Sequence, residues 1–162
     1  MRVFKKIYII FVLPVLLYSC ADTSACREET EVNVQINFYE RTYITATKKY
    51  AYNALTVDSI WAKGLDLDSF LYKKKLDQEL ILVPLRKTEN QSDFTIRFNN
   101  TTDTVSIFYQ NNDKFYLSLE CGCIVVHTID EVLSTGHFID SVAVINREVI
   151  NSNAENIQLY HF

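Results

Sequence analysis

Residues 32–38 read Val-Asn-Val-Gln-Ile-Asn-Phe, with an apolar side chain at every second position. Successive side chains of a β-strand point to opposite faces of its sheet, so this run predicts a strand with one buried and one solvated face. The same alternation recurs over 94–98, which read Phe-Thr-Ile-Arg-Phe. This period of two predicts a chain that is mainly β-structure.

Breaks rich in Asn and Asp separate the apolar runs, at 89–93, 99–103, 111–114 and 151–156. These residues favour turns because their short side chains bond the neighbouring backbone. About eight short strands at such spacing predict an antiparallel β-sandwich, immunoglobulin-like or similar, with an up-and-down barrel as the alternative. Residues 46–54 and 128–136 are each expected to include a helical turn. The expected strands lie near 31–41, 55–62, 79–85, 93–99, 104–110, 114–127, 137–146 and 156–161.

The first eighteen residues have the organisation of an export signal. Arg2, Lys5 and Lys6 form a basic head, and an apolar run follows from Ile7 to Tyr18. At about 1.5 Å per residue, a helix over this run would reach only about 18 Å, too short for a hydrocarbon layer of about 30 Å. The length is typical of the apolar core of a secretory signal. No later apolar run is long enough to predict a membrane span.

Leu17-Tyr18-Ser19-Cys20 resembles the lipobox of bacterial lipoproteins. The resemblance implies a signal peptide over 1–19 and a covalent lipid on Cys20, which becomes the first mature residue. A tether over 20–31 then leads to one β-sandwich domain over 32–162. The protein is expected in the cell envelope, anchored to the outer membrane and facing the periplasm, with the cell surface as the other candidate face. The alternative is an ordinary secretory signal cut near Ser19, which would release a soluble protein.

The charge of the mature chain argues against nucleic acid as a partner. Without residues 1–19 the chain has 13 basic and 20 acidic residues, a net charge of −7. Proteins that bind nucleic acid neutralise its phosphates with clustered Lys and Arg, and no such cluster offsets this total. The charge thus predicts no nucleic-acid partner. The predicted partners are the membrane, through the lipid that the lipobox resemblance implies, and another envelope protein.

Sequence motifs give no sign of catalysis. We find no Gly-rich phosphate loop, no H-E-x-x-H zinc motif and no G-x-S-x-G nucleophile motif. His127, His137 and His161 are scattered, and no Ser or carboxylate spacing marks one of them as a base. We therefore predict that the protein is not an enzyme and has no metal site and no cofactor beyond the lipid on Cys20.

Three cysteines remain once Cys20 carries lipid: Cys26, Cys121 and Cys123. An envelope location permits disulfides, so we expect a bridge from Cys26 to either Cys121 or Cys123, with the other thiol buried. Closing so long a loop would stabilise the fold by roughly 3–5 kcal/mol on the chain-entropy model. The alternative is a redox or metal-binding Cys-x-Cys site. The apolar run 124–126 disfavours it, because such surroundings raise a thiol pKa.

Three tripeptides combine Asp, then Ser or Thr, then an apolar residue: Asp58-Ser59-Ile60, Asp103-Thr104-Val105 and Asp140-Ser141-Val142. They resemble the acceptor sequence of a general O-glycosylation system that modifies exported proteins in some Gram-negative bacteria. Ser59, Thr104 and Ser141 are therefore candidate glycosylation sites. The alternative is strand initiation, in which Asp ends a turn and the next two residues enter a strand.

Several short segments of the chain occur in an order that resembles a known family. With the lipobox, they resemble small bacterial envelope lipoproteins known only as a domain of unknown function. The resemblance implies a β-rich envelope lipoprotein and brings no activity, ligand or functional residue. The segments are 68–72, 82–85, 103–107, 121–122, 135–142 and 155–157.

Together these features predict a non-enzymatic, lipid-anchored module that docks on another envelope protein. The alternative is a lipoprotein that binds a glycan or another nutrient through aromatic loop residues, because Tyr offers a large contact area at a small rotamer cost. A flat apolar sheet face would favour docking, and an aromatic pocket beside the loops would favour ligand binding. The tyrosines in or beside irregular stretches are Tyr39, Tyr43, Tyr50, Tyr52 and Tyr72.

Overall fold

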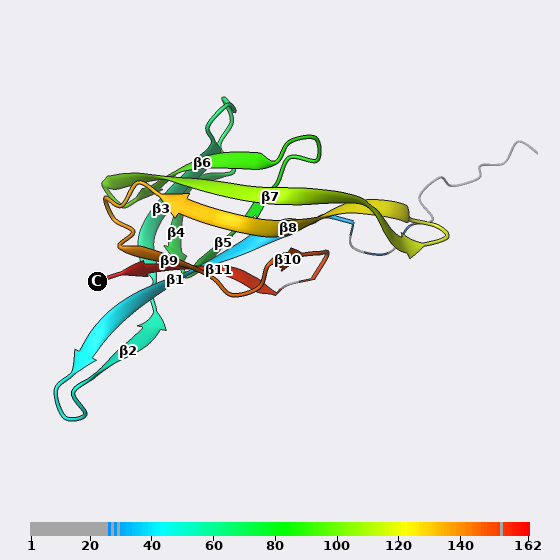
Figure 1. Cartoon of the computed structure of the whole chain (residues 1–162). Coiled ribbons are helices and arrows are strands. Elements are labelled where there is room, and N and C mark those ends of the chain that lie inside the picture. Colours follow the sequence, from blue (N-terminus) through cyan, green and yellow to red (C-terminus); the bar gives the residue numbers. More distant parts are fainter. Residues whose placement is uncertain (1–25, 27, 29, 153) are drawn as a thin grey trace, which may run out of the picture.

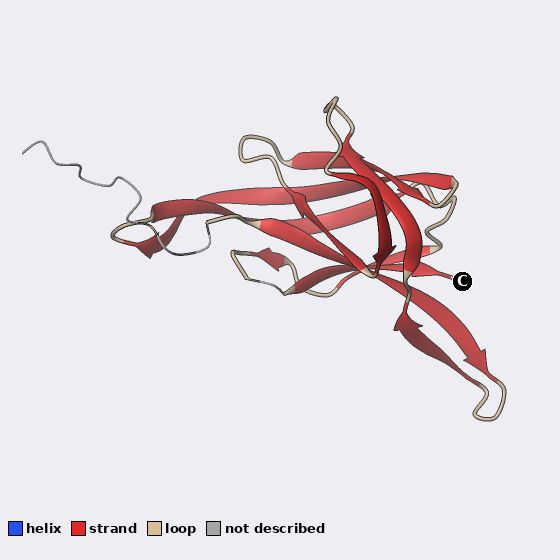
Figure 2. Cartoon of the chain, turned by 180° about the vertical axis from the view of Figure 1, so that it is seen from behind, coloured by secondary structure: helices blue, strands red, loops and turns tan. Residues whose placement is uncertain are grey.

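The computed structural model describes residues 26, 28, 30–152 and 154–162, and every regular element in these residues is a strand (Figures 1 and 2). Within them no helix is long and apolar enough to cross a membrane. The eleven strands are β1 (Asn33–Ile44), β2 (Lys49–Ala54), β3 (Val57–Gly64), β4 (Tyr72–Gln78), β5 (Leu80–Pro84), β6 (Gln91–Phe98), β7 (Thr101–Ser118), β8 (Gly122–Ser134), β9 (Ser141–Val144), β10 (Glu148–Val149) and β11 (Glu155–His161).

The strands form two sheets that pack into a sandwich. Sheet A has the order β2-β1-β11-β9, and β5 also pairs with β1. Sheet B has the order β10-β8-β7-β6-β3-β4. The described pairings are antiparallel except for β1 with β11, which run parallel. The all-β sandwich is therefore confirmed, with more strands than expected, and the barrel alternative is wrong because two separate sheets form.

The core lies between the sheets, where the predicted alternation places its apolar residues. Val34, Ile36 and Phe38 of β1 are buried, and so are Phe94, Ile96 and Phe98 of β6. The rings of Phe38 and Phe98 meet edge to face across the core, with centroids 5.4 Å apart. Full burial of such side chains contributes about 1.5–3 kcal/mol each, so this layer makes a large favourable contribution to folding, which offsets the conformational entropy that the chain loses.

The longest hairpin differs from the expected strands. The sequence predicted a break at 111–114 and a single strand over 114–127. Instead β7 continues through 111–114 with a register shift between Asn112 and Phe115, so the polar residues form a strand irregularity. The chain reverses after Ser118, whose hydroxyl accepts a hydrogen bond from the Cys121 N–H at 3.1 Å. Gly122 follows with φ +70°, a conformation that glycine adopts at little cost.

Several other sequence predictions are corrected by the structure. Residues 49–54 and 128–134 are strands, so the helical turns expected over 46–54 and 128–136 are wrong. The edge strand β4 was missed because Lys73, Lys74 and Lys75 conceal any alternation. The expected strand over 137–146 shortens to β9, since residues 135–140 form a loop around a buried carboxylate.

That carboxylate belongs to Asp103, whose side chain is 0% exposed. The backbone N–H groups of His137, Phe138 and Ile139 donate hydrogen bonds to it at 2.7, 2.7 and 2.9 Å. The Thr135 hydroxyl donates another at 2.6 Å. Burial raises the pKa of Asp103, but these donors together outweigh burial and lower its pKa to about 2. Asp103 therefore stays ionised and holds the loop that leads from sheet B to sheet A.

His127 is a second buried titratable group, 2% exposed, and its Nδ1 lies 2.7 Å from the Asn111 Oδ1. Burial, and then the charge of Lys87, lower the pKa of His127 to about 4. The folded state therefore holds His127 neutral. Its contribution to stability falls as the pH drops from about 6.5 to about 4, because the unfolded chain then binds more protons.

Asp103→Asn should lower the free energy of unfolding at pH 7 by about 2 kcal/mol or more, because an amide presents N–H groups to the loop donors. In the parent, this contribution is complete above about pH 4 and falls away toward pH 2, because protonation then favours the unfolded chain. Urea titrations from pH 7 to pH 2 measure both effects. Asp58→Asn, at an exposed Asp of the same tripeptide type, is the control. Equal stability of the two variants would contradict the assigned role.

Candidate interaction surface

β1 and β2 extend beyond the sandwich as a two-stranded hairpin, at the lower left of Figure 1. β2 pairs with β1 from Tyr39 to Ile44, whereas the described pairing of β11 with the other edge of β1 ends at Glu40. The outer half of the hairpin is therefore a two-stranded ribbon. Such ribbons are marginally stable alone, so contacts between their side chains matter.

One face of this hairpin is aromatic. In the strand register Tyr43 lies opposite Tyr50, Arg41 opposite Tyr52, and Tyr39 beside Tyr160 of β11. Paired residues project from the same side of a sheet, and the alternate residues Ile36 and Phe38 face the core. We call the resulting outward set the aromatic surface: Tyr39, Arg41, Tyr43, Tyr50, Tyr52, Tyr160 and Phe162.

The side chains of the aromatic surface contact one another. Ring centroids lie 5.2 Å apart for Tyr43 and Tyr50, and 5.1 Å apart for Tyr52 and Tyr160. The Arg41 guanidinium carbon lies 3.5 Å from the ring centroid of Phe162 and 4.5 Å from that of Tyr50. The first ring pair is tilted and the second meets edge to face. Aromatic pairs of this kind add about 0.5–1.5 kcal/mol each beyond burial, and a guanidinium over a ring face adds a similar amount. Arg41 thus joins the C-terminal residues to the hairpin.

The base of the aromatic surface is fixed by hydrogen bonds. The Tyr39 hydroxyl donates to Glu155 Oε1 at 3.0 Å, and the Tyr160 hydroxyl donates to Gln158. Burial and then the bond to Glu155 raise the pKa of Tyr39, while burial and then the neighbouring Tyr52 raise the pKa of Tyr160. Both phenols therefore stay neutral at physiological pH. Neutral phenols and a guanidinium can donate hydrogen bonds and pack against aromatic or apolar groups.

The outer rings remain accessible to a partner. Tyr43, Tyr50 and Tyr52 are each about half exposed, and Phe162 only slightly less. A contiguous exposed aromatic patch differs from scattered surface apolar residues and is typical of interaction sites. Four of the five tyrosines singled out in the sequence therefore gather here, on strands rather than loops. Sequence reasoning missed Arg41, Tyr160 and Phe162, because the parallel β1–β11 pairing that joins them leaves no local signal.

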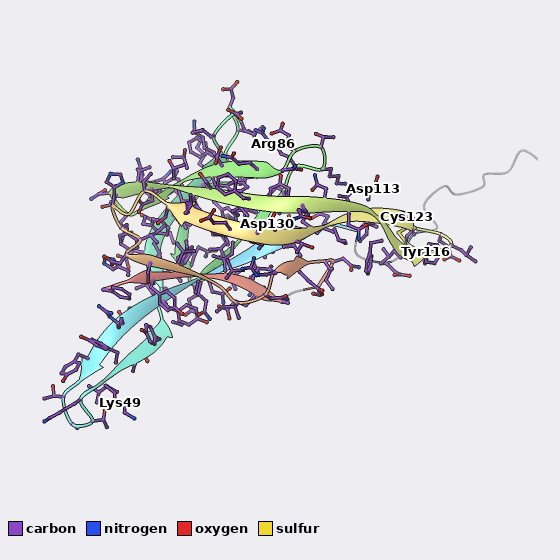
Figure 3. All side chains as sticks on the ribbon, viewed as in Figure 1. Lys49, Arg86, Asp113, Tyr116, Cys123 and Asp130 are labelled. Atoms are coloured by element: carbon purple, nitrogen blue, oxygen red, sulfur yellow. A yellow bond between two sulfur atoms is a disulfide. The ribbon has the colours of Figure 1, made fainter. Side chains whose placement is uncertain are left out.

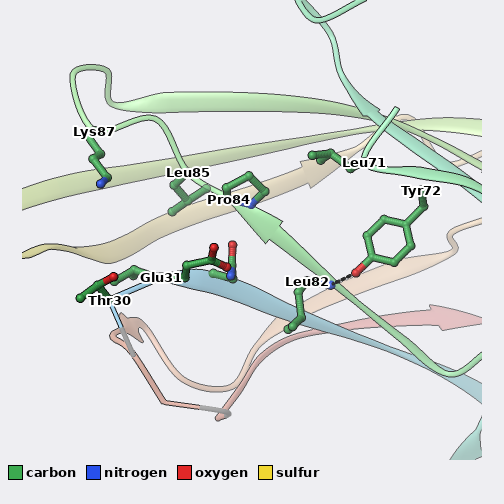
Figure 4. Close-up of a pocket in the computed structure, with 10 residues that line it drawn as sticks. Thr30, Glu31, Leu71, Tyr72, Leu82, Pro84, Leu85 and Lys87 are labelled. Atoms are coloured by element: carbon green, nitrogen blue, oxygen red, sulfur yellow. Dashed lines mark hydrogen bonds between the residues drawn. The ribbon is translucent and has the colours of Figure 1, made fainter. Parts of the chain in front are cut away.

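Tyr72, the fifth tyrosine, lines a separate open groove of about 600 Å³ (Figure 4). The groove lies between the residues that precede β1 and strands β4 and β5. The Tyr72 hydroxyl accepts a hydrogen bond from the Leu82 N–H at 2.9 Å, and Tyr72 is the single aromatic ring in the lining. Glu31 and Lys87 bring opposite charges to the walls. With one ring in its lining, this groove is not the aromatic pocket beside the loops that the ligand-binding alternative predicts.

The cysteines lie at the far end of the molecule. Cys26 is bonded to Cys121, with Cα atoms 4.7 Å apart, at the tip of the β7–β8 hairpin. This is one of the two predicted pairings. Cys123 is exposed, so the expectation of a buried thiol is wrong, because the turn before Gly122 breaks the register that would have aimed it inward. Cys123 and Lys49 lie at opposite ends of the molecule (Figure 3).

The candidate modification sites differ in setting. Ser59 is half-buried in β3 and its N–H donates to Asn99 Oδ1 at 2.9 Å. Thr104 is half-buried in β7, between β6 and β8. Ser141 is exposed at the start of β9, at one edge of sheet A. Glycosylation of all three stays a prediction. Cys20 lies outside the described residues, so its lipidation stays a prediction as well.

Metal binding finds no support in the geometry. Among the residues that the structure describes, no three His, Cys, Asp or Glu side chains come together as a metal site. Cys121 of the alternative Cys-x-Cys site is engaged in the disulfide, which leaves it no thiolate to offer a metal.

Residues 54–161 match a family of unknown function, DUF6452. The chain belongs to this family. No curated protein and no solved structure matches the chain. The expected membership of an uncharacterised family is therefore confirmed. The family match begins where β2 ends, although β1 is an inner strand of sheet A with three described partners, so the folded domain extends beyond the matched residues.

Arg41→Gln should loosen the hairpin without unfolding the sandwich. Loss of two ring contacts at the partly exposed Arg41 would cost about 1 kcal/mol, which raises amide exchange in β2 about fivefold. Hydrogen exchange followed by mass spectrometry measures the exchange rates of the β2 amides. The control is Arg97→Gln, because Arg97 lies 3.7 Å over Trp61 but belongs to sheet B. An unchanged β2 in Arg41→Gln would show that the cation–π contacts do not order the hairpin.

Proposed function

We propose that this protein is a lipid-anchored, non-enzymatic module of a bacterial cell envelope that docks on another envelope protein through the aromatic surface. The anchor is the lipid predicted on Cys20, and the expected location is the periplasmic face of the outer membrane. The observation that carries the proposal is the aromatic surface, whose outer rings are about half exposed on a hairpin that projects from the sandwich.

The composition of the aromatic surface supports a protein partner. Tyr, Phe and Arg are enriched at the centres of protein interfaces, where they combine large contact area with few rotamers to freeze. Here the rings are already packed on one another and Arg41 is stacked between two of them. These side chains therefore lose part of their conformational entropy when the protein folds. Less is lost when a partner binds, which strengthens binding.

The position of the aromatic surface also supports docking. Only five residues lie between Cys20 and Cys26, and the six steps from one Cα atom to the next span at most about 20 Å. The disulfide ties Cys26 to the β7–β8 tip, and the β1–β2 hairpin projects from the opposite end in both views of the molecule. A membrane that held Cys20 would therefore lie on the side away from the aromatic surface, which would remain free for a partner.

The second candidate function is binding of a glycan or another small polar nutrient in the groove beside Tyr72. The volume of about 600 Å³ and the charged walls favour this class of ligand. The groove is open and has one ring to stack on a sugar, whereas the aromatic surface has several rings but does not enclose a ligand. We therefore rank docking first.

Site-specific photo-cross-linking in living cells tests docking. A photoreactive phenylalanine analogue is placed at Tyr50 or Tyr52, and at Leu76 of β4 as a control, since Leu76 is equally exposed on the other sheet. We expect one dominant protein adduct from positions 50 and 52 and none from 76. No adduct at 50 and 52, or the same adducts at all three positions, would contradict docking through this surface.

A further inference from the structure

The β7–β8 hairpin ends in a second exposed apolar site. Leu119 at its turn is 89% exposed, and Tyr116, just before the turn, is 58% exposed. No other large apolar residue in the described part of the chain is as exposed as Leu119. Tyr116 and Cys123 lie together at this tip, beyond the body of the sandwich (Figure 3). The tip therefore presents apolar side chains that the fold itself does not cover.

The chain that leads to the lipid is tied to this same tip. Cys26 is bonded to Cys121, two residues after Leu119. From Cys26 to Cys20 the chain can span at most about 20 Å. If Cys20 carries the lipid, as the proposed function requires, the tip cannot lie far from the bilayer surface. Because the disulfide holds the tip close to the lipid on Cys20, the bilayer is the apolar phase that the exposed side chains of the tip can reach.

We propose that the β7–β8 tip contacts the bilayer that holds Cys20, with Leu119 inserted below the headgroups and Tyr116 at their level. Tyr is enriched at this depth, because its ring is apolar and its hydroxyl remains hydrated. Glu120 is exposed beside Leu119, and a carboxylate stays in water or among headgroups, so insertion is shallow. The inference rests on the proposed lipid anchor and adds a second point of attachment.

Two points of attachment would set the orientation of the domain. A single flexible tether lets a domain turn about its anchor, whereas a tip that also touches the bilayer restricts that rotation. The β1–β2 hairpin, at the opposite end, would then point away from the membrane. Contact between the tip and the bilayer would thereby hold the aromatic surface at a defined distance from the membrane and facing an envelope partner.

The experiment uses the full-length lipidated protein in vesicles of phosphatidylethanolamine and phosphatidylglycerol. Leu119→Trp places a fluorophore at the tip, and because Leu119 is exposed, folding does not depend on it. Ile44→Trp, on the β1–β2 hairpin, is the matched control. The native Trp61 of β3 gives the baseline that is subtracted from both variants. Emission is compared with and without lipids brominated in their acyl chains, and the mass of the N-terminal peptide reports lipidation.

We expect a blue-shifted emission that brominated lipid quenches for Leu119→Trp, and neither effect for Ile44→Trp. A lipidated protein that sediments with the vesicles but shows no quenching at position 119, or equal quenching at 119 and 44, overturns this inference and leaves the anchor standing. A mass without lipid on Cys20 overturns the anchor, and this inference with it.

Discussion

The rest of the structure depends on the hydrogen bonds that the loop 135–140 donates to the ionised, buried Asp103 carboxylate. It receives hydrogen bonds from three consecutive backbone N–H groups and the Thr135 hydroxyl, and these bonds fix residues 135–140 between sheet B and sheet A. That loop places Phe138 between Phe98, 4.7 Å away, and His161, 4.0 Å away by ring centroids. A single carboxylate thus connects the core to the last strand.

The same loop positions the C-terminal part of the aromatic surface. Asp140 donates its N–H to the Tyr160 carbonyl at 2.8 Å and accepts the Phe162 N–H at 2.6 Å. Phe162 in turn supports Arg41 and, through it, the projecting hairpin. Residues separated by more than a hundred positions in the chain therefore act as one surface, because the parallel β1–β11 pairing brings them together.

The sequence predicted what depends on local pattern. The alternation over 32–38 and 94–98 identifies the inner faces of β1 and β6, and the four tyrosines of the hairpin stand out in the sequence because they lie in or beside irregular stretches. What could not be predicted depends on distant partners. In the sequence, Asp103 looks like any Asp that precedes a strand. Its role depends on the loop 135–140, which lies more than thirty positions later and donates hydrogen bonds to it. The run 111–114 reads as a turn, yet Asn111 and Asn112 pair with β8, and the pairing resumes at Phe115 after a register shift, so β7 continues through the run.

The proposed function assigns a role to each end of the molecule. At one end a disulfide holds Cys26, six positions after the predicted lipid anchor, and the other end displays aromatic side chains. The most direct test is hydrogen exchange of the lipidated protein in native envelope membranes, compared with the same protein purified in detergent. The account predicts that, in the membranes, protection rises over 39–54, where the partner docks, and that β3 to β6 exchange alike in both samples. Unchanged exchange over 39–54, with new protection around the Tyr72 groove, would contradict docking through the aromatic surface and favour a bound ligand.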